Sequence, residues 1–218
     1  ALERASGKLK IALAREPELA LAPVSVAAST QDILANVETV KVFVMEAEDA
    51  LKDGRVQDAR RILGVLGSEK VISVTHLPLA SYPAAITEAV ALLEKGETKS
   101  AKSVLQTALN SQVVLNYTIP LAVVRAKNLL LATDDLSKKE DRSESENEKL
   151  ADLLNKSRTE LEFAEALGYG TQRDFQDIYE QIDLIEKKTE KGKSGSGFLG
   201  KIKKQIKGVL ESNQPEKK

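Results

Sequence analysis

EAEDALKDGRVQDARRILGVLGSEKVISVTHLPLA at residues 46–80 and EAVALLEKGETKSAKSVLQTALNSQVVLNYTIPLA at residues 88–122 are two versions of one pattern. Their matching apolar and turn residues, such as Gly54 and Gly96, always lie 42 positions apart. A constant offset over many positions indicates one supersecondary unit used twice, each copy being too small to bury its apolar face alone. The repeat predicts the architecture of the chain but carries no chemistry.

Each copy of the repeat predicts a helix, a tight turn and a second helix. The apolar helical pattern stops just before Gly54 or Gly96, where a glycine adopts the left-handed conformation that ends a helix at little cost. Ala59 and Ala101 then stand where the second helix must approach the first closely. The two copies therefore predict helical hairpins of the tetratricopeptide type.

A short β-branched run follows each hairpin and ends at a proline, which favours extended backbone before it. These runs, Val71–Thr75 and Val113–Tyr117, predict two short strands that pair with each other, and Val24–Val26 predicts a further strand at a sheet edge. The expected fold class is mainly α: two hairpin repeats, further long helices and a small β element of two or three strands.

Capping signals and apolar periodicity predict the remaining helices. Ser29 and Asp32 predict a cap for the helix that enters the first repeat, and the charged, serine-rich residues 134–148 predict a mobile solvated loop. The other expected helices are 121–131, 150–167 closed by Gly168, and one that starts at a Thr171–Asp174 capping box and runs to about Ile185.

The expected segments are an N-terminal segment at 1–29, a single helical domain at 30–190, a Gly/Ser linker at 191–197, a basic amphipathic helix at 198–211 and a tail at 212–218.

Composition limits the function classes. The 218 residues carry a net charge of −1, so no global field attracts nucleic acid, and a nucleic-acid partner is not expected. No cysteine is present, which excludes disulfides and thiolate chemistry. No apolar run approaches the roughly 20 residues that span a bilayer. The alanine-rich residues 20–28 are interrupted by Pro23 and do not resemble a signal-peptide core.

Gly195, Gly197 and Gly200 imitate the glycine spacing of nucleotide-binding loops. Such a loop binds phosphate only between a strand and a following βαβ unit, whereas lysine-rich residues precede this one and 18 residues follow it. We interpret the glycines as a flexible linker and expect no cofactor.

Beyond that linker the sequence predicts a basic amphipathic helix. Such a helix lies on an anionic membrane surface, binds a partner's groove, or docks on its own domain, and the last is the commoner role. The candidate contact residues are Phe198, Leu199, Lys201, Ile202, Lys203, Lys204, Ile206, Lys207, Val209 and Leu210.

No catalytic or metal-binding constellation is evident in the sequence. His76 is the only histidine, so neither a histidine-based triad nor a multi-histidine metal site can form within one chain. Glu160, Glu162 and Glu165 predict a solvated helix surface, and Asp134-Asp135 lacks the spacing and the glycine of a calcium loop. We expect no catalytic residue and no metal ligand.

The order of several motifs resembles the YfdX family of bacterial proteins. They are the Ala-x-x-x-Leu-x-x-Gly turn with its following Ala and Leu, Leu77-Pro78-Leu79, the second hairpin Ala89–Leu109, Ile119-Pro120-Leu121, and Leu161-Glu162-x-Ala164-x-x-Leu167-Gly168-Tyr169-Gly170. In organisation the resemblance extends over about residues 33–180. It implies a mainly helical protein associated with bacterial stress responses, often exported to the periplasm, without an established enzymatic activity.

We therefore expect a non-enzymatic protein that acts through protein or ligand binding on its surface. A homo-oligomer is expected, since a two-unit repeat leaves apolar ends that need a second subunit. Two alternatives remain open: a peptide-binding adaptor of the tetratricopeptide type, and a peripheral protein recruited to anionic membranes by residues 198–211.

Overall fold

The computed structural model describes residues 1–190, 193–194 and 198–214. The chain forms two compact units: Ala1–Ala28 with Ile72–Asn116, here the hairpin unit, and Ser29–Val71 with Tyr117–Lys218, here the bundle unit. These boundaries differ from the segments expected from sequence, because residues 1–28 join residues 72–116 instead of preceding one domain.

The β element is a three-stranded antiparallel sheet of order β1-β2-β3. Its strands are β1 (Ala22–Asp32), β2 (Ser68–Leu77) and β3 (Val113–Pro120). The two predicted strand runs lie in β2 and β3, which are neighbours as expected. The Val24–Val26 run lies in β1, which is an edge strand, so the mainly α fold with a small sheet is confirmed.

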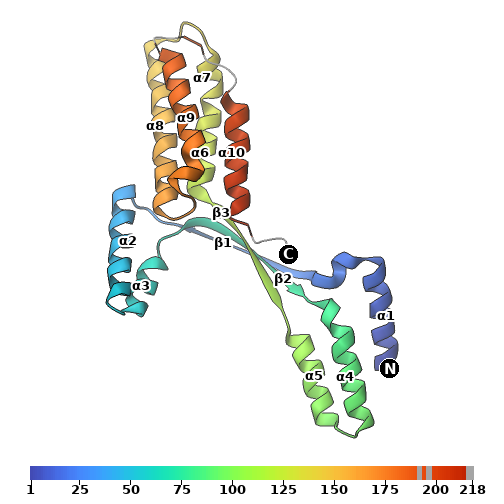
Figure 1. Cartoon of the computed structure of the whole chain (residues 1–218). Helices are drawn as coiled ribbons and strands as arrows, with labels where there is room; N and C mark the ends of the chain where they lie inside the picture. The colour runs from blue at the N-terminus through green and yellow to red at the C-terminus, as the bar shows by residue number, and fades with distance from the viewer. Residues whose placement is uncertain (191–192, 195–197, 215–218) are drawn as a thin grey trace. The chain divides into compact units, whose positions relative to one another are not determined.

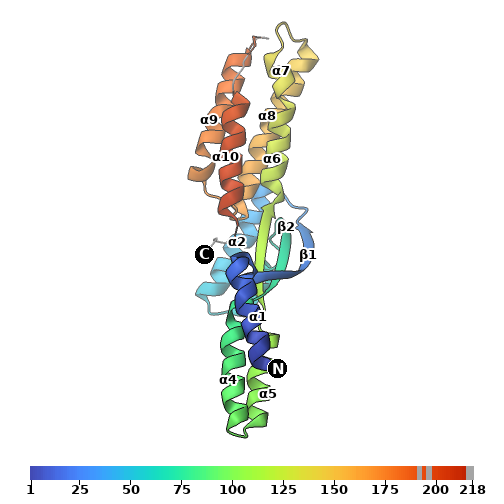
Figure 2. The ribbon, with the colours of Figure 1, turned by 90° about the vertical axis from the view of Figure 1, so that its right-hand side faces the viewer.

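The hairpin unit contains α1 (Leu2–Arg15), η1 (Pro17–Leu21), η2 (Leu79–Ser81), α4 (Tyr82–Glu94) and α5 (Thr98–Asn110). Helix α1 packs against α4, as Figure 2 shows. Helix α1 has no counterpart among the helices predicted from the sequence.

Both predicted helical hairpins are present. The first consists of α2 (Val37–Lys52) and α3 (Val56–Leu63) in the bundle unit, and the second of α4 and α5. Gly54 and Gly96 have φ angles of 72° and 80°. At each turn the glycine N–H and the next N–H donate back to carbonyls of the preceding helix, at 3.0 and 2.7 Å for Gly54 and Arg55. Ala59 and Ala101 are buried where the helices meet.

The predicted cap of α2 is wrong. Ser29 and Asp32 belong to β1, and the N-cap of α2 is Asn36, seven residues after Ser29. The Asn36 side-chain oxygen accepts from the Thr39 N–H at 2.8 Å. Sheet pairing keeps the residues before Ile33 extended, which overrides the local capping signal.

The bundle unit is built on four long helices that lie side by side in both views (Figures 1 and 2): α6 (Leu121–Ala132), α8 (Glu144–Ala166), α9 (Gln172–Thr189) and α10 (Phe198–Ser212). Leu130, Leu161 and Phe175 are among the fully buried side chains at its centre. The Thr171–Asp174 capping box is confirmed, and Gly168 ends α8 with a φ of 80°.

The predicted mobile loop at 134–148 is also wrong. Residues Asp134–Lys138 form α7, and α8 begins at Glu144 behind a Ser143–Glu146 capping box. Arg142 is buried and donates to four backbone carbonyls, those of Leu136, Lys139, Thr189 and Lys193. Charge alone did not make this segment a loop, because one arginine ties it to the end of α9.

The C-terminal helix predicted at 198–211 is α10, and it packs on α9 and α6. Of the predicted linker, residues 193 and 194 are described. Gly195 and Gly197 of the nucleotide-like motif and residues 215–218 of the tail lie outside the described residues. No helix in the described ranges is both long and apolar enough to span a bilayer.

Candidate functional site

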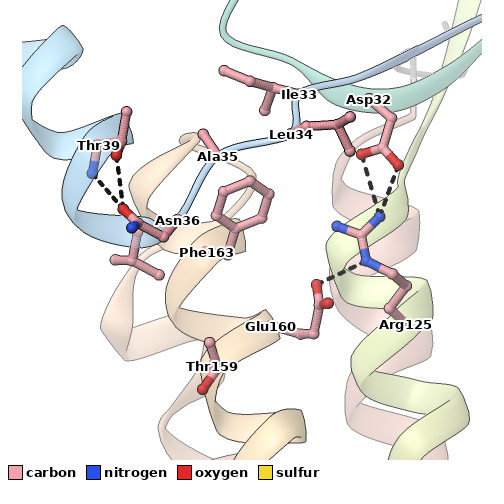
Figure 3. Close-up of a pocket in the computed structure, with 11 residues that line it drawn as sticks. Asp32, Ile33, Leu34, Ala35, Asn36, Thr39, Arg125, Thr159, Glu160 and Phe163 are labelled. Carbon is pink, nitrogen blue, oxygen red and sulfur yellow. Dashed lines mark hydrogen bonds and ion pairs between the residues drawn. The ribbon is translucent and has the colours of Figure 1, made fainter.

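The bundle unit holds an open pocket of about 740 Å³ (Figure 3). The turn between β1 and α2 forms one wall, and α6 and α8 form the other. Its lining residues are Asp32, Ile33, Leu34, Ala35, Asn36, Val37, Thr39, Arg125, Thr159, Glu160 and Phe163. This volume lies within the range of small-molecule sites.

Arg125 of α6 is the centre of the polar part of the lining. Its Nε donates to Glu160 Oε2 at 2.9 Å, and its Nη1 contacts both carboxylate oxygens of Asp32 at 3.2 and 3.3 Å (Figure 3). Burial disfavours the charge on Arg125, but the hydrogen bonds and charges of Glu160 and Asp32 outweigh burial and raise its pKa. The guanidinium is thus a fixed cation between two carboxylates.

A second layer holds this group in place from the start of β2. Ser68 is fully buried, its hydroxyl donates to Asp32, and Arg125 Nη2 donates to the same hydroxyl at 3.3 Å. The Ser68 N–H donates to the Tyr169 hydroxyl at 2.9 Å. Burial raises the pKa of the Tyr169 phenol above its ordinary value. Hydrogen bonds therefore connect the end of β1, the start of β2, α6 and α8 around the Arg125 side chain.

Apolar side chains from both walls line much of the rest of the pocket, beside Asn36, Thr39 and Thr159. Phe163 of α8 is nearly buried, and the turn residues Ile33 and Ala35 pack against the bundle core. Leu34 is 98% exposed, which is unusual for a leucine and places an apolar side chain at the mouth of the pocket.

The pocket carries a net charge of −1, since Asp32 and Glu160 are anionic and Arg125 is the one cation among its lining residues. Asn36 is engaged as the cap of α2. Arg125, the one cation of the pocket lining that could hold a peptide carboxylate, is already engaged by the protein's own Asp32 and Glu160.

A comparison with family models matches residues 1–118 to the family described as YfdX protein. The chain belongs to the YfdX family. No curated protein and no solved structure matches it. The YfdX match contains α1, both hairpins and most of β3, so it begins earlier and ends earlier than the resemblance seen in the sequence. Asp32 and Ser68 lie inside the matched part, whereas Arg125 and Glu160 lie beyond it.

The predicted contact residues of α10 are divided between two faces of the helix. Ile202, Ile206 and Val209 are buried in the bundle core, and Leu210 packs against it. Lys201, Lys203, Lys204 and Lys207 are exposed, and Lys207 lies 3.6 Å from Glu211. The side chains of Phe198 and Leu199 lie outside the described set. In this arrangement the apolar face covers the YfdX chain's own core, so contact with a membrane would require α10 to undock.

The three glutamates of α8 have different surroundings. Glu162 is exposed as predicted, but Glu160 contacts Arg125, and Glu165 accepts from the Tyr179 hydroxyl at 2.7 Å. The solvated-surface prediction is therefore wrong for Glu160 and Glu165. Arg125 and Glu160 lie 35 positions apart, so the sequence around Glu160 gives no local signal of their contact.

His76 is nearly buried, with Nδ1 3.1 Å from the Val74 carbonyl oxygen. Within the described part of the chain, no group of three or more acidic or histidine side chains is arranged to hold a metal ion.

Proposed function

We propose that this YfdX-family protein is non-enzymatic and acts by binding, and that the pocket beside Arg125 takes an organic cation with an apolar body. The observation that carries the proposal is the excess of one carboxylate over the guanidinium in a pocket that is also lined by Leu34, Phe163 and other apolar side chains.

Glu160 supplies the binding group for the cation. Among the hydrogen bonds of the described residues, Glu160 accepts with Oε2 only, which leaves Oε1 for a ligand ammonium. A charge-assisted hydrogen bond of this kind is stronger than a neutral one. An anionic ligand would instead have to displace Asp32 or Glu160 from Arg125 and would meet net negative charge.

The apolar side chains of the lining supply the remaining affinity. A phenyl or alkyl body between Leu34 and Phe163 would bury apolar surface that is now in water, at about 25 cal/mol per Å². Leu34 is exposed in the free protein, and a bound ligand would cover its side chain.

A matched pair of probes tests the charge preference. Titration calorimetry with 4-phenylbutylammonium and with 4-phenylbutyrate compares one apolar body carrying either charge. We expect the ammonium to bind at least about tenfold more tightly, a difference of about 1.4 kcal/mol. Tighter binding of the carboxylate would contradict the proposal.

Two variants locate the site. Glu160→Gln should remove the preference for the ammonium, because it takes away the unpaired carboxylate oxygen. Glu162→Gln removes one negative charge from an exposed position of the same helix and should leave binding unchanged. Equal effects of the two variants would show non-specific attraction rather than a site.

The association with bacterial stress and the export to the periplasm are also part of this proposal, and family membership is their support. A binding protein of this kind would take up cationic amphiphiles without changing them. Recovery of the probe chemically intact after prolonged incubation with the protein is the expected result, and its conversion would contradict the non-enzymatic role.

A further inference from the structure

Helix α10 differs in charge from the chain as a whole. It has four lysines and one glutamate, a net charge of +3, whereas the whole chain has a net charge of −1. The lysines are exposed, and within the described residues none of them forms an ion pair with another helix. The helix also lies beyond residue 118, where the match to the YfdX model ends. Its charge fits an anionic partner surface.

The opposite face of α10 is apolar. Ile206 and Val209 lie four and seven positions after Ile202, so the three side chains share one face, which is buried in the bundle core. An apolar face combined with a lysine face is the pattern of helices that lie in the plane of an anionic membrane. The helix therefore has both of the faces that such a membrane would bind.

Few polar contacts hold α10 in the bundle. Among the described residues, its hydrogen bonds to other elements come from the two residues that follow the helix. Asn213 Nδ2 donates to the Tyr169 carbonyl oxygen at 3.1 Å, and Gln214 Nε2 donates to the Thr118 carbonyl oxygen at 2.8 Å. Gln205 Oε1 is buried and has no hydrogen-bond partner among the same residues, which disfavours the docked state. The docked position thus depends mainly on the apolar face.

The connection to α9 is long enough for α10 to move away from the bundle. Arg142 binds the carbonyl oxygens of Thr189 and Lys193, and α10 begins at Phe198. The four residues 194–197 can span about 14 Å when extended. This length exceeds the distance of about 8–10 Å between the axes of packed helices. Undocking of α10 therefore leaves the contacts of Arg142 in place.

We propose that α10 leaves the bundle and lies on an anionic lipid bilayer. The bilayer favours the undocked helix, because the docked helix offers it lysines alone and the undocked helix offers lysines and the apolar face. A nucleic acid would bind the lysines but would give the apolar face no dry environment. Without anionic lipid α10 stays docked, because undocking takes the cover from the bundle core. This proposal is independent of the pocket beside Arg125.

Flotation of the full-length chain with vesicles tests the lysine face. Equimolar phosphatidylglycerol and phosphatidylcholine vesicles should bind the wild type, vesicles of phosphatidylcholine alone should not, and added salt should weaken the binding. Lys201→Gln with Lys204→Gln should lower the partition coefficient at least about tenfold, since each lysine near an anionic surface contributes about fivefold. Lys99→Gln with Lys102→Gln removes two exposed lysines of the same spacing from α5 and should leave binding unchanged.

A third variant tests the undocking step. Asn213→Ala with Gln214→Ala removes both hydrogen bonds to the bundle but alters neither face of α10, so it should bind the anionic vesicles at least about threefold more tightly than the wild type. Circular dichroism checks that this variant and the lysine variants fold.

Hydrogen exchange of the wild type tests the same step without a variant. Amides of α6 and α9 should exchange faster on anionic vesicles than in the free protein, because α10 no longer covers these helices. A wild type that does not bind anionic vesicles, equal losses in the two lysine variants, or unchanged exchange of α6 and α9 on the vesicles would each overturn the proposal. Binding by the Asn213 and Gln214 variant that is no tighter than that of the wild type would also overturn it.

Discussion

The bundle unit and the hairpin unit differ in the side chains that close them. The bundle buries Phe175, Leu130 and Leu161, together with isoleucines from α9 and α10, whereas the hairpin unit buries alanines. The bundle unit therefore has a core of large apolar side chains, whereas the helices of the hairpin unit meet through small side chains and bury less apolar surface.

The largest expected effect is a cavity in the bundle. Leu161→Ala removes a fully buried side chain and should lower the free energy of unfolding by about 2–5 kcal/mol. Leu93→Ala in α4 removes a side chain that is 42% exposed, and it should lower the free energy of unfolding by less than about 1 kcal/mol. Urea denaturation at low protein concentration measures both. Equal losses would remove the distinction between the units.

The next effect concerns the anchor at the far end of the bundle. Arg142→Ala leaves four backbone carbonyls without their common donor and should cost about 2–3 kcal/mol. Arg142→Lys keeps the charge, but its single ammonium cannot reach all four carbonyls, so an intermediate loss is expected. Thermal denaturation ranks the stability of the two variants and the wild type. An alanine variant as stable as the wild type would contradict the anchoring role of Arg142.

A smaller effect is expected at the two hairpin turns. Gly54→Ala and Gly96→Ala each place a side chain at a positive φ, which should cost about 1–2 kcal/mol. Gly7→Ala is the matched control in α1, where open space surrounds the new methyl group and alanine favours the helix by up to about 1 kcal/mol. Destabilisation by the control equal to that at the turns would contradict this account of the turns.

The smallest effect is a pH dependence in α8. Its Glu146 has a lowered pKa because Lys139 and the Ser143 N–H hydrogen-bond to the carboxylate. Since the unfolded chain binds this proton more readily, the charged form stabilises the fold above the ordinary glutamate pKa, and this contribution is lost as the pH falls. The melting temperature of Glu146→Gln should therefore be lower than that of the wild type at pH 7. The difference between the two melting temperatures should shrink towards pH 3. A difference that does not change with pH would contradict the assignment.

The elements that sequence predicted are those with local signals. Gly54, Gly96 and Gly168 marked helix ends, and Thr171 with Asp174 marked a helix start. The signals failed where distant contacts decided the structure. Sheet pairing took Ser29 and Asp32 from the expected helix, and Arg142 ordered a segment that its charge made resemble a loop.

The pocket was not predictable for the same reason. Asp32, Arg125 and Glu160 come from β1, α6 and α8, and Asp32 lies 93 positions from Arg125 in sequence. Each residue alone is an ordinary surface charge. Their common position follows only from the docking of the β1–α2 turn on the bundle.

Hydrogen exchange of the full-length chain tests the difference between the units most directly. Amides of α4 and α5 should exchange faster than amides of α6, α8 and α9, because the hairpin unit buries alanines where the bundle buries large apolar side chains. Equal protection of the helices in the two units would contradict this difference between their cores.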